Sequence, residues 1–186
     1  MLHSIAQGLL IASPGLDCPF FGRSVVLMVD HGEEGSFGFA LTKPSQLRFS
    51  RLRDELGLEG KRELPVLYGG PVETNSGWFL FERDPDEELG DDAIAIGDRL
   101  ACSASIQRIQ RFEREAPEDR RGLFFLGYSG WGPGQLEEEF KQGSWIPADL
   151  DPSLIFERDV DERWRAALDS LGIDPAFFVS RGGPAS

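Results

Sequence analysis

The sequence predicts an α+β fold, with a mixed β-sheet in a single compact domain. Strand-like and helix-like stretches are interspersed without the regular β-α-β order of a doubly wound sheet. The 186 residues, 40% of them hydrophobic, suffice for one domain with a buried core. We find no internal repeat and no linker, so one domain is expected over residues 1–186, with a frayed C-terminal tail.

Strands dominate the N-terminal half of this prediction. The strongest signal is 23–31, which is β-branched and apolar as far as Val29. A turn and a returning strand at 36–44 follow, which indicates an antiparallel hairpin. Gly38 inside the returning strand indicates a bulge or a close backbone approach. The other expected elements are strands at 9–13, 64–71, 76–84 and 93–97, and a short helix at 50–58 with Ser50 as its cap.

The C-terminal half mixes helices and strands. Ile106, Ile109 and Phe112 recur at spacing three, which predicts a helix over 103–116 with Ser103 as its cap. The apolar run 122–131 predicts a strand buried on both faces. The remaining expected elements are a helix at 132–143, short strands at 144–150 and 153–157, and a capped helix at 159–173.

Composition excludes several classes of protein. The formal net charge of −13 disfavours direct nucleic-acid binding, because such binding depends on a positive patch that neutralises phosphates. No apolar run approaches the length of a membrane span, and the N-terminus lacks the basic start of a signal peptide. Two cysteines, Cys18 and Cys102, provide no disulfide framework. We therefore expect an acidic, cytoplasmic protein without membrane association.

Residues 127–140, GYSGWGPGQLEEEF, place Trp131 among glycines directly before an expected helix. Such glycines can bind phosphate, but their spacing matches neither known phosphate-loop pattern and no lysine follows. The stretch is better interpreted as a forced turn in which Trp131 folds back over the core. The alternative is a ligand pocket beside Trp131, with polar contacts from Tyr128 and Gln135.

Few side chains in the sequence suggest catalysis or metal binding. His31 ends the strongest strand and is either a general base or ligand contact, or a turn histidine that bonds to its own hairpin. Cys102 precedes an expected helix start, where a thiolate would be favoured. Zinc sites need three or four ligands, and the acidic stretch at 84–92 lacks the glycine of a calcium-binding loop. No catalytic residue, metal or cofactor is predicted.

Four stretches resemble the YqgE/AlgH family, in the order found in that family. They are SPGLDCPFFGRSVVLMVDHGEEGSFGFALTKP, LYGGPV, GYSGWGPGQLEEEFKQGSWI and LIFERDVDERWRAALDSLGID. The resemblance extends from about residue 5 to residue 175. It implies a mixed sheet curled into a partial barrel, with helices packed outside. It also implies a family named for transcriptional regulation and otherwise uncharacterised.

The chain departs from this family at a few positions. Family members commonly carry an aspartate, an asparagine and a histidine where this chain has Cys18, Thr42 and Phe81. The missing histidine removes a titratable group, which favours a binding role over catalysis.

We therefore predict a non-enzymatic regulatory domain that binds an unidentified small molecule or protein and affects transcription indirectly. The predicted cleft contains Arg23, Ser24, His31, Gly69, Gly70, Tyr128, Trp131 and Gln135. One alternative is a hydrolase or thiol-dependent enzyme that uses His31 or Cys102. Another is a structural or interaction module without a small-molecule site.

Overall fold

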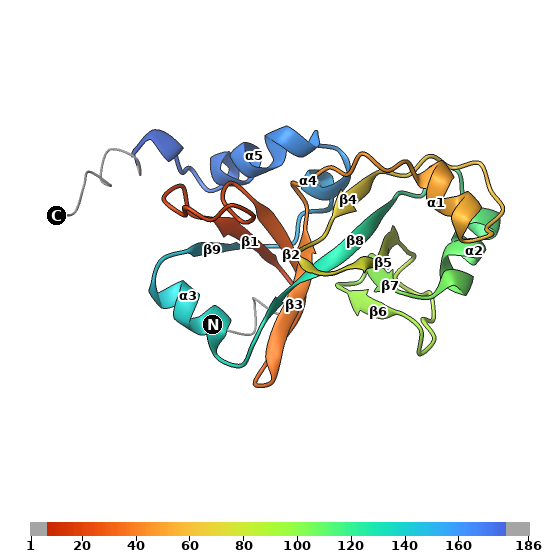
Figure 1. The fold of residues 1–186 in the computed structure, drawn as a ribbon, viewed down its shortest axis with the longest axis horizontal. Coiled ribbons are helices and arrows are strands. Elements are labelled where there is room, and N and C mark those ends of the chain that lie inside the picture. Colours follow the sequence, from red (N-terminus) through yellow and green to blue (C-terminus); the bar gives the residue numbers. More distant parts are fainter. Residues whose placement is uncertain (1–6, 178–186) are drawn as a thin grey trace. The chain divides into compact units, whose positions relative to one another are not determined.

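The computed structural model describes residues 7–177, which form two compact units (Figure 1). Unit 1 combines the segments Met1–Lys43 and Ser129–Ser186, and unit 2 is Pro44–Tyr128. Strand β8 (Gly122–Trp131) belongs to both units, since its last three residues lie in unit 1. The single domain expected from the sequence stays a prediction.

The sheet of unit 1 is antiparallel. Its strand order is β9-β1-β2-β3, followed by the end of β8. Their bounds are Trp145–Ala148 for β9, Leu9–Ala12 for β1, Val25–Gly32 for β2 and Gly35–Ala40 for β3. The predicted hairpin is confirmed, because β2 and β3 pair and place His31 opposite Ser36.

Gly38 is the point where this hairpin is most tightly packed. The pairing of β2 with β3 shifts register between Met28 and Asp30, so a bulge lies beside Gly38. A Cβ atom at Gly38 would lie 2.3 Å from the backbone oxygen of Leu27. The predicted bulge and close backbone approach are both confirmed.

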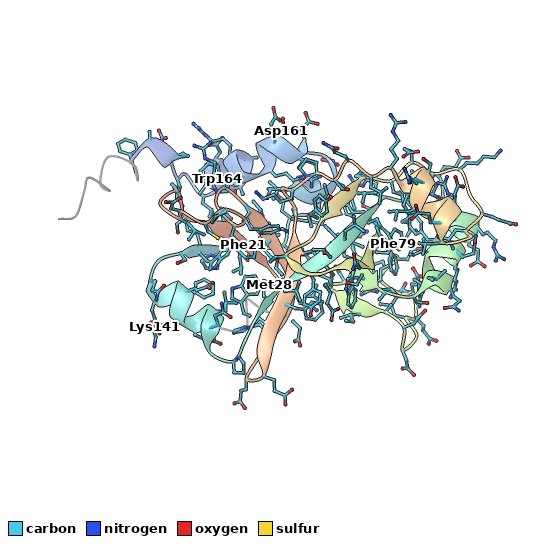
Figure 2. The ribbon with its side chains drawn as sticks, viewed as in Figure 1. Phe21, Met28, Phe79, Lys141, Asp161 and Trp164 are labelled. Atoms are coloured by element: carbon cyan, nitrogen blue, oxygen red, sulfur yellow. The ribbon has the colours of Figure 1, made fainter. Side chains whose placement is uncertain are left out.

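Within residues 7–177, unit 1 also contains helical segments around a core rich in tryptophan. The segments are α3 (Gln135–Lys141), α4 (Pro152–Phe156), the 3₁₀ helix η2 (Val160–Glu162) and α5 (Arg163–Ser170). Trp131 is 6% exposed and packs with Trp145 and Phe21, which confirms the interpretation that it folds back over the core. Met28 lies in the same core (Figure 2).

The strand predicted at 153–157 is wrong, because helix α4 occupies these residues. The Asp151 side chain accepts hydrogen bonds from the backbone N–H groups of Ser153 and Leu154, and Pro152 occupies the first helical turn. The three apolar residues 154–156 fit a short helix as well as a strand. The cap decides in favour of the helix.

The sheet of unit 2 is mixed, as predicted. Strands β6, β7 and β5 pair antiparallel in that order and β5 pairs antiparallel with β8, whereas β4 runs parallel to β8. The bounds are Val66–Tyr68 for β4, Val72–Glu82 for β5, Ile94–Ile96 for β6 and Leu100–Ser103 for β7. Strand β7 was not predicted.

The strand order continues through β8, but the sheet does not close. No pairing joins β6 to β9 at the two ends of this order within residues 7–177. The structure is thus a mixed α/β fold with a large, mainly antiparallel sheet. The partial barrel implied by the family resemblance is not confirmed.

Two helices complete unit 2, and both begin at other residues than predicted. Helix α1 (Phe49–Glu55) follows Arg48 rather than Ser50 and has no side-chain cap. Helix α2 (Ile106–Glu115) is capped by Ser105, because Ser103 belongs to β7. The core beneath the helices contains Phe79, which is fully buried (Figure 2).

Candidate functional site

The end of the β2–β3 hairpin is connected to helix α3 by His31. The Nδ1 atom of His31 lies 2.5 Å from Ser36 Oγ, and its Nε2 atom lies 3.1 Å from Glu137 Oε1. The histidine side chain is 8% exposed and that of Glu137 is 35% exposed. We call Ser36, His31 and Glu137 the histidine bridge. Of the two interpretations of His31, bonding to its own hairpin is confirmed.

A second set of hydrogen bonds surrounds Trp131. The Nε1 groups of Trp131 and Trp145 each donate to Glu139 Oε2 at 2.8 Å. Gln135 accepts from the backbone N–H of Gly132 at 3.0 Å and donates to Glu139 Oε1 at 3.3 Å. A carboxylate on a short helix therefore holds two buried indoles in place.

Two further residues of the predicted cleft, Arg23 and Ser24, lie in unit 1 and contact Trp164 and Phe21. Arg23 has a φ of 57° and places its guanidinium 5.6 Å from the centre of the Trp164 ring. Ser24 is fully buried and donates to the carbonyl of Phe21 at 2.6 Å. Both residues stabilise the loop before β2.

Gly69, Gly70 and Tyr128 belong to unit 2, where they lie around a wide bulge. The pairing of β5 with β8 shifts register between Val72 and Gly77, opposite Gly127. Gly127 has a φ of 70°, and a Cβ atom there would lie 2.6 Å from the carbonyl oxygen of Gly70. The structure thus brings His31, Trp131 and Gln135 together in unit 1. A cleft that unites them with Gly69, Gly70 and Tyr128 stays a prediction.

Cys102 lies in a strand and not before a helix. It is fully buried in β7, and burial raises the pKa of its thiol to about 12. A thiol in this state is almost entirely protonated at neutral pH and is a poor nucleophile. The thiol-dependent enzyme is therefore disfavoured.

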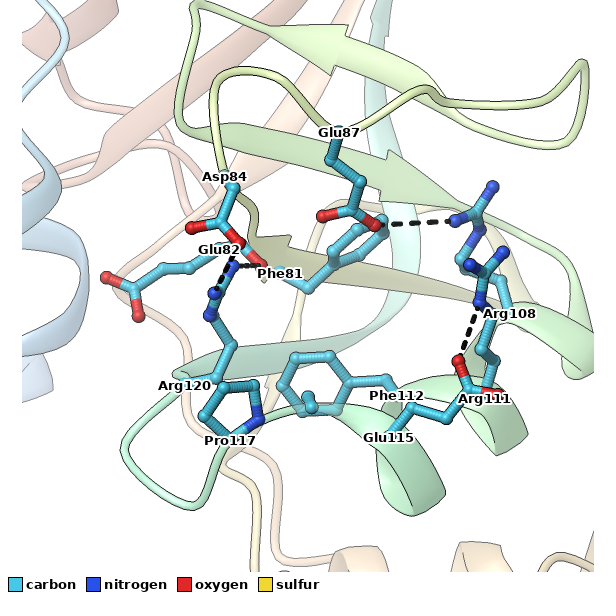
Figure 3. A pocket seen from close by; sticks show the side chains of 11 residues that line it. Phe81, Glu82, Asp84, Glu87, Arg108, Arg111, Phe112, Glu115, Pro117 and Arg120 are labelled. Carbon is cyan, nitrogen blue, oxygen red and sulfur yellow. Dashed lines mark hydrogen bonds and ion pairs between the residues drawn. The ribbon is translucent and has the colours of Figure 1, made fainter.

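Unit 2 contains a pocket of about 180 Å³ that the sequence did not reveal (Figure 3). One wall of the pocket is the end of β5 and the loop that follows it. The other wall is helix α2 and the loop that follows that helix. Phe81 and Phe112 supply much of its apolar lining, with ring centroids 6.2 Å apart. The other lining residues are Glu82, Asp84, Glu87, Arg108, Arg111, Glu115, Ala116, Pro117 and Arg120.

Arg108 is the most deeply buried charged residue of this pocket. Its side chain is 6% exposed, and its guanidinium carbon lies 5.8 Å from the centre of the Phe81 ring. Nη2 donates to Asp92 Oδ1 at 2.7 Å, whereas Nη1 comes only within 4.0 Å of Glu87 Oε1. The Nε atom is buried and has no hydrogen-bond partner. One buried guanidinium thus makes a single hydrogen bond.

The carboxylates beside the pocket are held ionised by arginines. Hydrogen bonding from Arg108 lowers the pKa of Asp92. Burial alone would raise the pKa of Glu82, but the hydrogen bonds and charge of Arg121, together with the charge of Arg120, lower it overall. Arg120 also pairs with Asp84 at 3.1 Å. Asp92 and Glu82 are therefore ionised at neutral pH.

Four residues with notable contacts were not predicted as candidates from the sequence: Ser36, Glu137, Glu139 and Arg108. Ser36 had a detectable signal, since a two-stranded hairpin with a short turn places it opposite His31. Glu137 and Glu139 lie in a run of three glutamates at an expected helix, a pattern that gives no sign of their partners. Arg108 gave no signal, because it lies in an expected helix among alternating charges that resemble a solvated face.

Comparison with known proteins identifies relatives over nearly the whole chain. The model of the family described as DUF179, AlgH-like, matches residues 9–176. The chain belongs to the AlgH-like family. Its relatives include a UPF0301 protein of Ruegeria pomeroyi, 38% identical over 181 residues that cover 95% of this chain and 97% of that protein. A UPF0301 protein of Anaeromyxobacter dehalogenans is 36% identical over 190 residues, which cover 97% and 95%.

Solved structures of similar fold exist. The AlgH protein from Pseudomonas aeruginosa has a TM-score of 0.73 and 28% identity, over 98% of this chain and 96% of that one. A protein from Corynebacterium diphtheriae has a TM-score of 0.71 over 89% of this chain and 86% of that one, and at 23% identity it supports the fold alone. The family resemblance inferred from the signatures is confirmed, and the family is uncharacterised.

Between residues 7 and 177, the structure has no helix that is both long and apolar enough to cross a membrane. The expected fraying of the C-terminal tail concerns residues outside the described range.

Proposed function

We propose that this protein is a non-enzymatic binding domain whose partner docks on the surface around the histidine bridge. The observation that carries the proposal is the charge of that surface. The hairpin exposes Asp30, Glu33 and Glu34, and Glu137 is partly exposed where it contacts His31. A surface with this excess of carboxylates favours a partner that presents positive charge and repels nucleic-acid phosphates.

The geometry supports recognition better than turnover. Both ring nitrogens of His31 have partners, and the backbone N–H of Gly132 donates to Gln135 Oε1. Groups held in this way are pre-organised for binding, because little conformational entropy remains to be lost. We propose a regulatory role exerted through a protein or small-molecule partner, with indirect effects on transcription. The unpaired Cys18 and Cys102 support a cytoplasmic location.

Capture of partners from a cell lysate, compared between variants, tests this proposal. Immobilised wild-type protein, Glu137→Gln and Gln135→Ala would be compared by mass spectrometry, with Glu138→Gln as the control on an exposed neighbour. We expect a partner that the wild type and the control retain and both site variants lose. Retention by both site variants would contradict a site at the histidine bridge.

A DNA mobility-shift assay at physiological salt tests the exclusion of nucleic acid. We expect no shift below micromolar protein. Sequence-selective binding at nanomolar protein would overturn the indirect mode of action.

A second candidate function is a hydrolase built on the histidine bridge. Ser36, His31 and Glu137 adjoin one another in the order nucleophile, base and carboxylate, at 2.5 and 3.1 Å. The ring nitrogens are exchanged relative to the Ser-His-Asp triad, because Ser36 contacts Nδ1 and Glu137 contacts Nε2. A fluorophosphonate probe would label Ser36 in such an enzyme, and Ser36→Ala would abolish the labelling. Absence of labelling in the folded wild type would eliminate this candidate.

A further inference from the structure

The pocket beside Arg108 shares no residue with the surface of the proposed function, and its chemistry defines a ligand class. Its volume of about 180 Å³ lies below the range of roughly 300–1,000 Å³ that drug-sized ligands occupy. A nucleotide or a peptide is too large to be enclosed there. The occupant that fits is a small metabolite.

Arg108 supplies the recognition of a carboxylate. A buried guanidinium that makes one hydrogen bond is rare, since unsatisfied buried donors cost free energy. Its Nη1 group has only the distant Glu87 carboxylate, at 4.0 Å, which is beyond hydrogen-bonding range. A ligand carboxylate that accepts from Nη1 would give the guanidinium a second hydrogen bond beside the one from Nη2 to Asp92.

The balance of charge argues against a purely anionic ligand. The pocket is lined by three arginines and by four carboxylates, so the lining carries one net negative charge. The members are Arg108, Arg111, Arg120, Glu82, Asp84, Glu87 and Glu115. A dianion such as phosphate would add to this excess, whereas a ligand that also carries an ammonium group would not.

Glu87 is the group placed to receive the ammonium. It lies beside Arg108 on the loop after β5 (Figure 3), with Oε1 at 4.0 Å from Nη1, and its side chain is 33% exposed. The backbone N–H of Glu87 donates to the carbonyl oxygen of Asp84, so these two acidic residues belong to the same turn. Asp84 is engaged by Arg120 at 3.1 Å, and Glu87 has only its weak contact with Arg108.

We propose that this pocket binds an α-amino acid. The carboxylate lies on Arg108, the ammonium group on Glu87, and an apolar side chain packs against Phe81 and Phe112.

The test uses NMR of the isotope-labelled full chain with pools of the natural L-amino acids. L-Leucine is then compared with 4-methylpentanoate, which lacks the amine, and with 3-methylbutylamine, which lacks the carboxylate. We expect shifts at Phe112 and Ala116 with an amino acid, and binding at least about tenfold weaker for each truncated probe, as expected when one charged hydrogen bond is lost. Equal binding of 4-methylpentanoate and leucine would overturn the proposal, as would the absence of shifts with every pool.

Variants locate the binding on named side chains. Arg108→Lys keeps the charge but removes the fork of donors, and we expect at least about tenfold weaker binding of leucine. The control is Arg114→Lys, an exposed arginine of the same helix outside this pocket, and should leave binding unchanged. Equal affinity of Arg108→Lys and the control would refute the role of Arg108.

Glu87→Gln tests the same site through a partly exposed side chain, so it remains informative even if Arg108→Lys fails to fold. We expect it to weaken leucine binding and to leave 4-methylpentanoate binding unchanged. Unchanged leucine binding would overturn the assignment of the ammonium site. Glu137→Gln should bind leucine normally, which separates this proposal from the surface at the histidine bridge.

Discussion

Buried polar groups are hydrogen-bonded to different extents in two regions of the molecule. One region is the histidine bridge with its neighbours in unit 1, and the other is the Arg108 pocket in unit 2. Around Trp131, a single carboxylate, Glu139, accepts from two indoles, and both ring nitrogens of His31 have partners. In unit 2, Arg108 is buried just as deeply but makes one hydrogen bond. Because buried polar groups are normally paired, the first arrangement is explained by the fold itself. The second fits the amino-acid ligand that we propose for the pocket.

The largest expected effect concerns the hairpin that carries His31. Gly38→Ala would place a Cβ atom 2.3 Å from Leu27 O, a backbone atom that cannot move aside cheaply. We expect a loss of about 3 kcal/mol or more in the free energy of unfolding, measured by chemical denaturation.

Gly132→Ala is the matched control in the signature turn. Its new Cβ atom would meet only Gln135 Oε1, at 3.9 Å, so we expect a change below about 1 kcal/mol. The positive φ in this turn, 74°, belongs to Gly134 and not to Gly132. If Gly132→Ala lowered the free energy of unfolding as much as Gly38→Ala, close packing around the glycine would not explain the cost of either substitution.

The next effect concerns the carboxylate that joins the two tryptophans. Glu139→Ala leaves both indole N–H groups without their acceptor, and we expect a loss of about 2–4 kcal/mol in unfolding free energy. Tryptophan fluorescence during denaturation measures it. Glu138→Ala, an exposed neighbour, should change stability by less than about 0.5 kcal/mol. Equal losses of unfolding free energy in Glu139→Ala and Glu138→Ala would show that the hydrogen bonds from the two indoles do not stabilise unit 1.

A smaller effect concerns pH and the rim of the pocket in unit 2. The pKa of Glu82 is lower in the folded chain than in the unfolded one, because Arg121 outweighs the opposing effect of burial. Its contribution is therefore present above the unfolded pKa and is lost as the pH falls through the folded pKa. We expect Glu82→Gln to reduce stability by about 2 kcal/mol at pH 7 and by progressively less below pH 4. A difference independent of pH would contradict this linkage.

The smallest effect involves no change in sequence. Cys18 is partly exposed, whereas Cys102 is fully buried with a pKa of about 12. We expect a thiol reagent at pH 8 to modify one cysteine of the native protein, and the second only after unfolding. Rapid modification of both would reopen Cys102 as a candidate nucleophile.

Much of the strand pattern could be predicted from local sequence. The strand 122–131 matches β8 throughout, and the hairpin at 23–44 contains β2 and β3. In these stretches apolar, β-branched runs end at turn residues, so a local signal is sufficient. Helix starts were less predictable. Ser50 and Ser103 have the right chemistry for caps, but Ser50 lies inside helix α1 and Ser103 belongs to strand β7.

The sequence by itself determined the family, the mixed α+β class and the burial of Trp131, because signature order and apolar periodicity are local properties of the chain. Only the tertiary structure decided that Glu137 meets His31 and that Glu87 faces Arg108. The two residues of each pair come from segments distant in sequence. Neither segment by itself indicates which charged residue of the other segment it will contact. Strand pairing and helix packing set the distances from His31 to Glu137 and from Arg108 to Glu87. They thereby decide that both ring nitrogens of His31 have partners, whereas Arg108 borders a pocket.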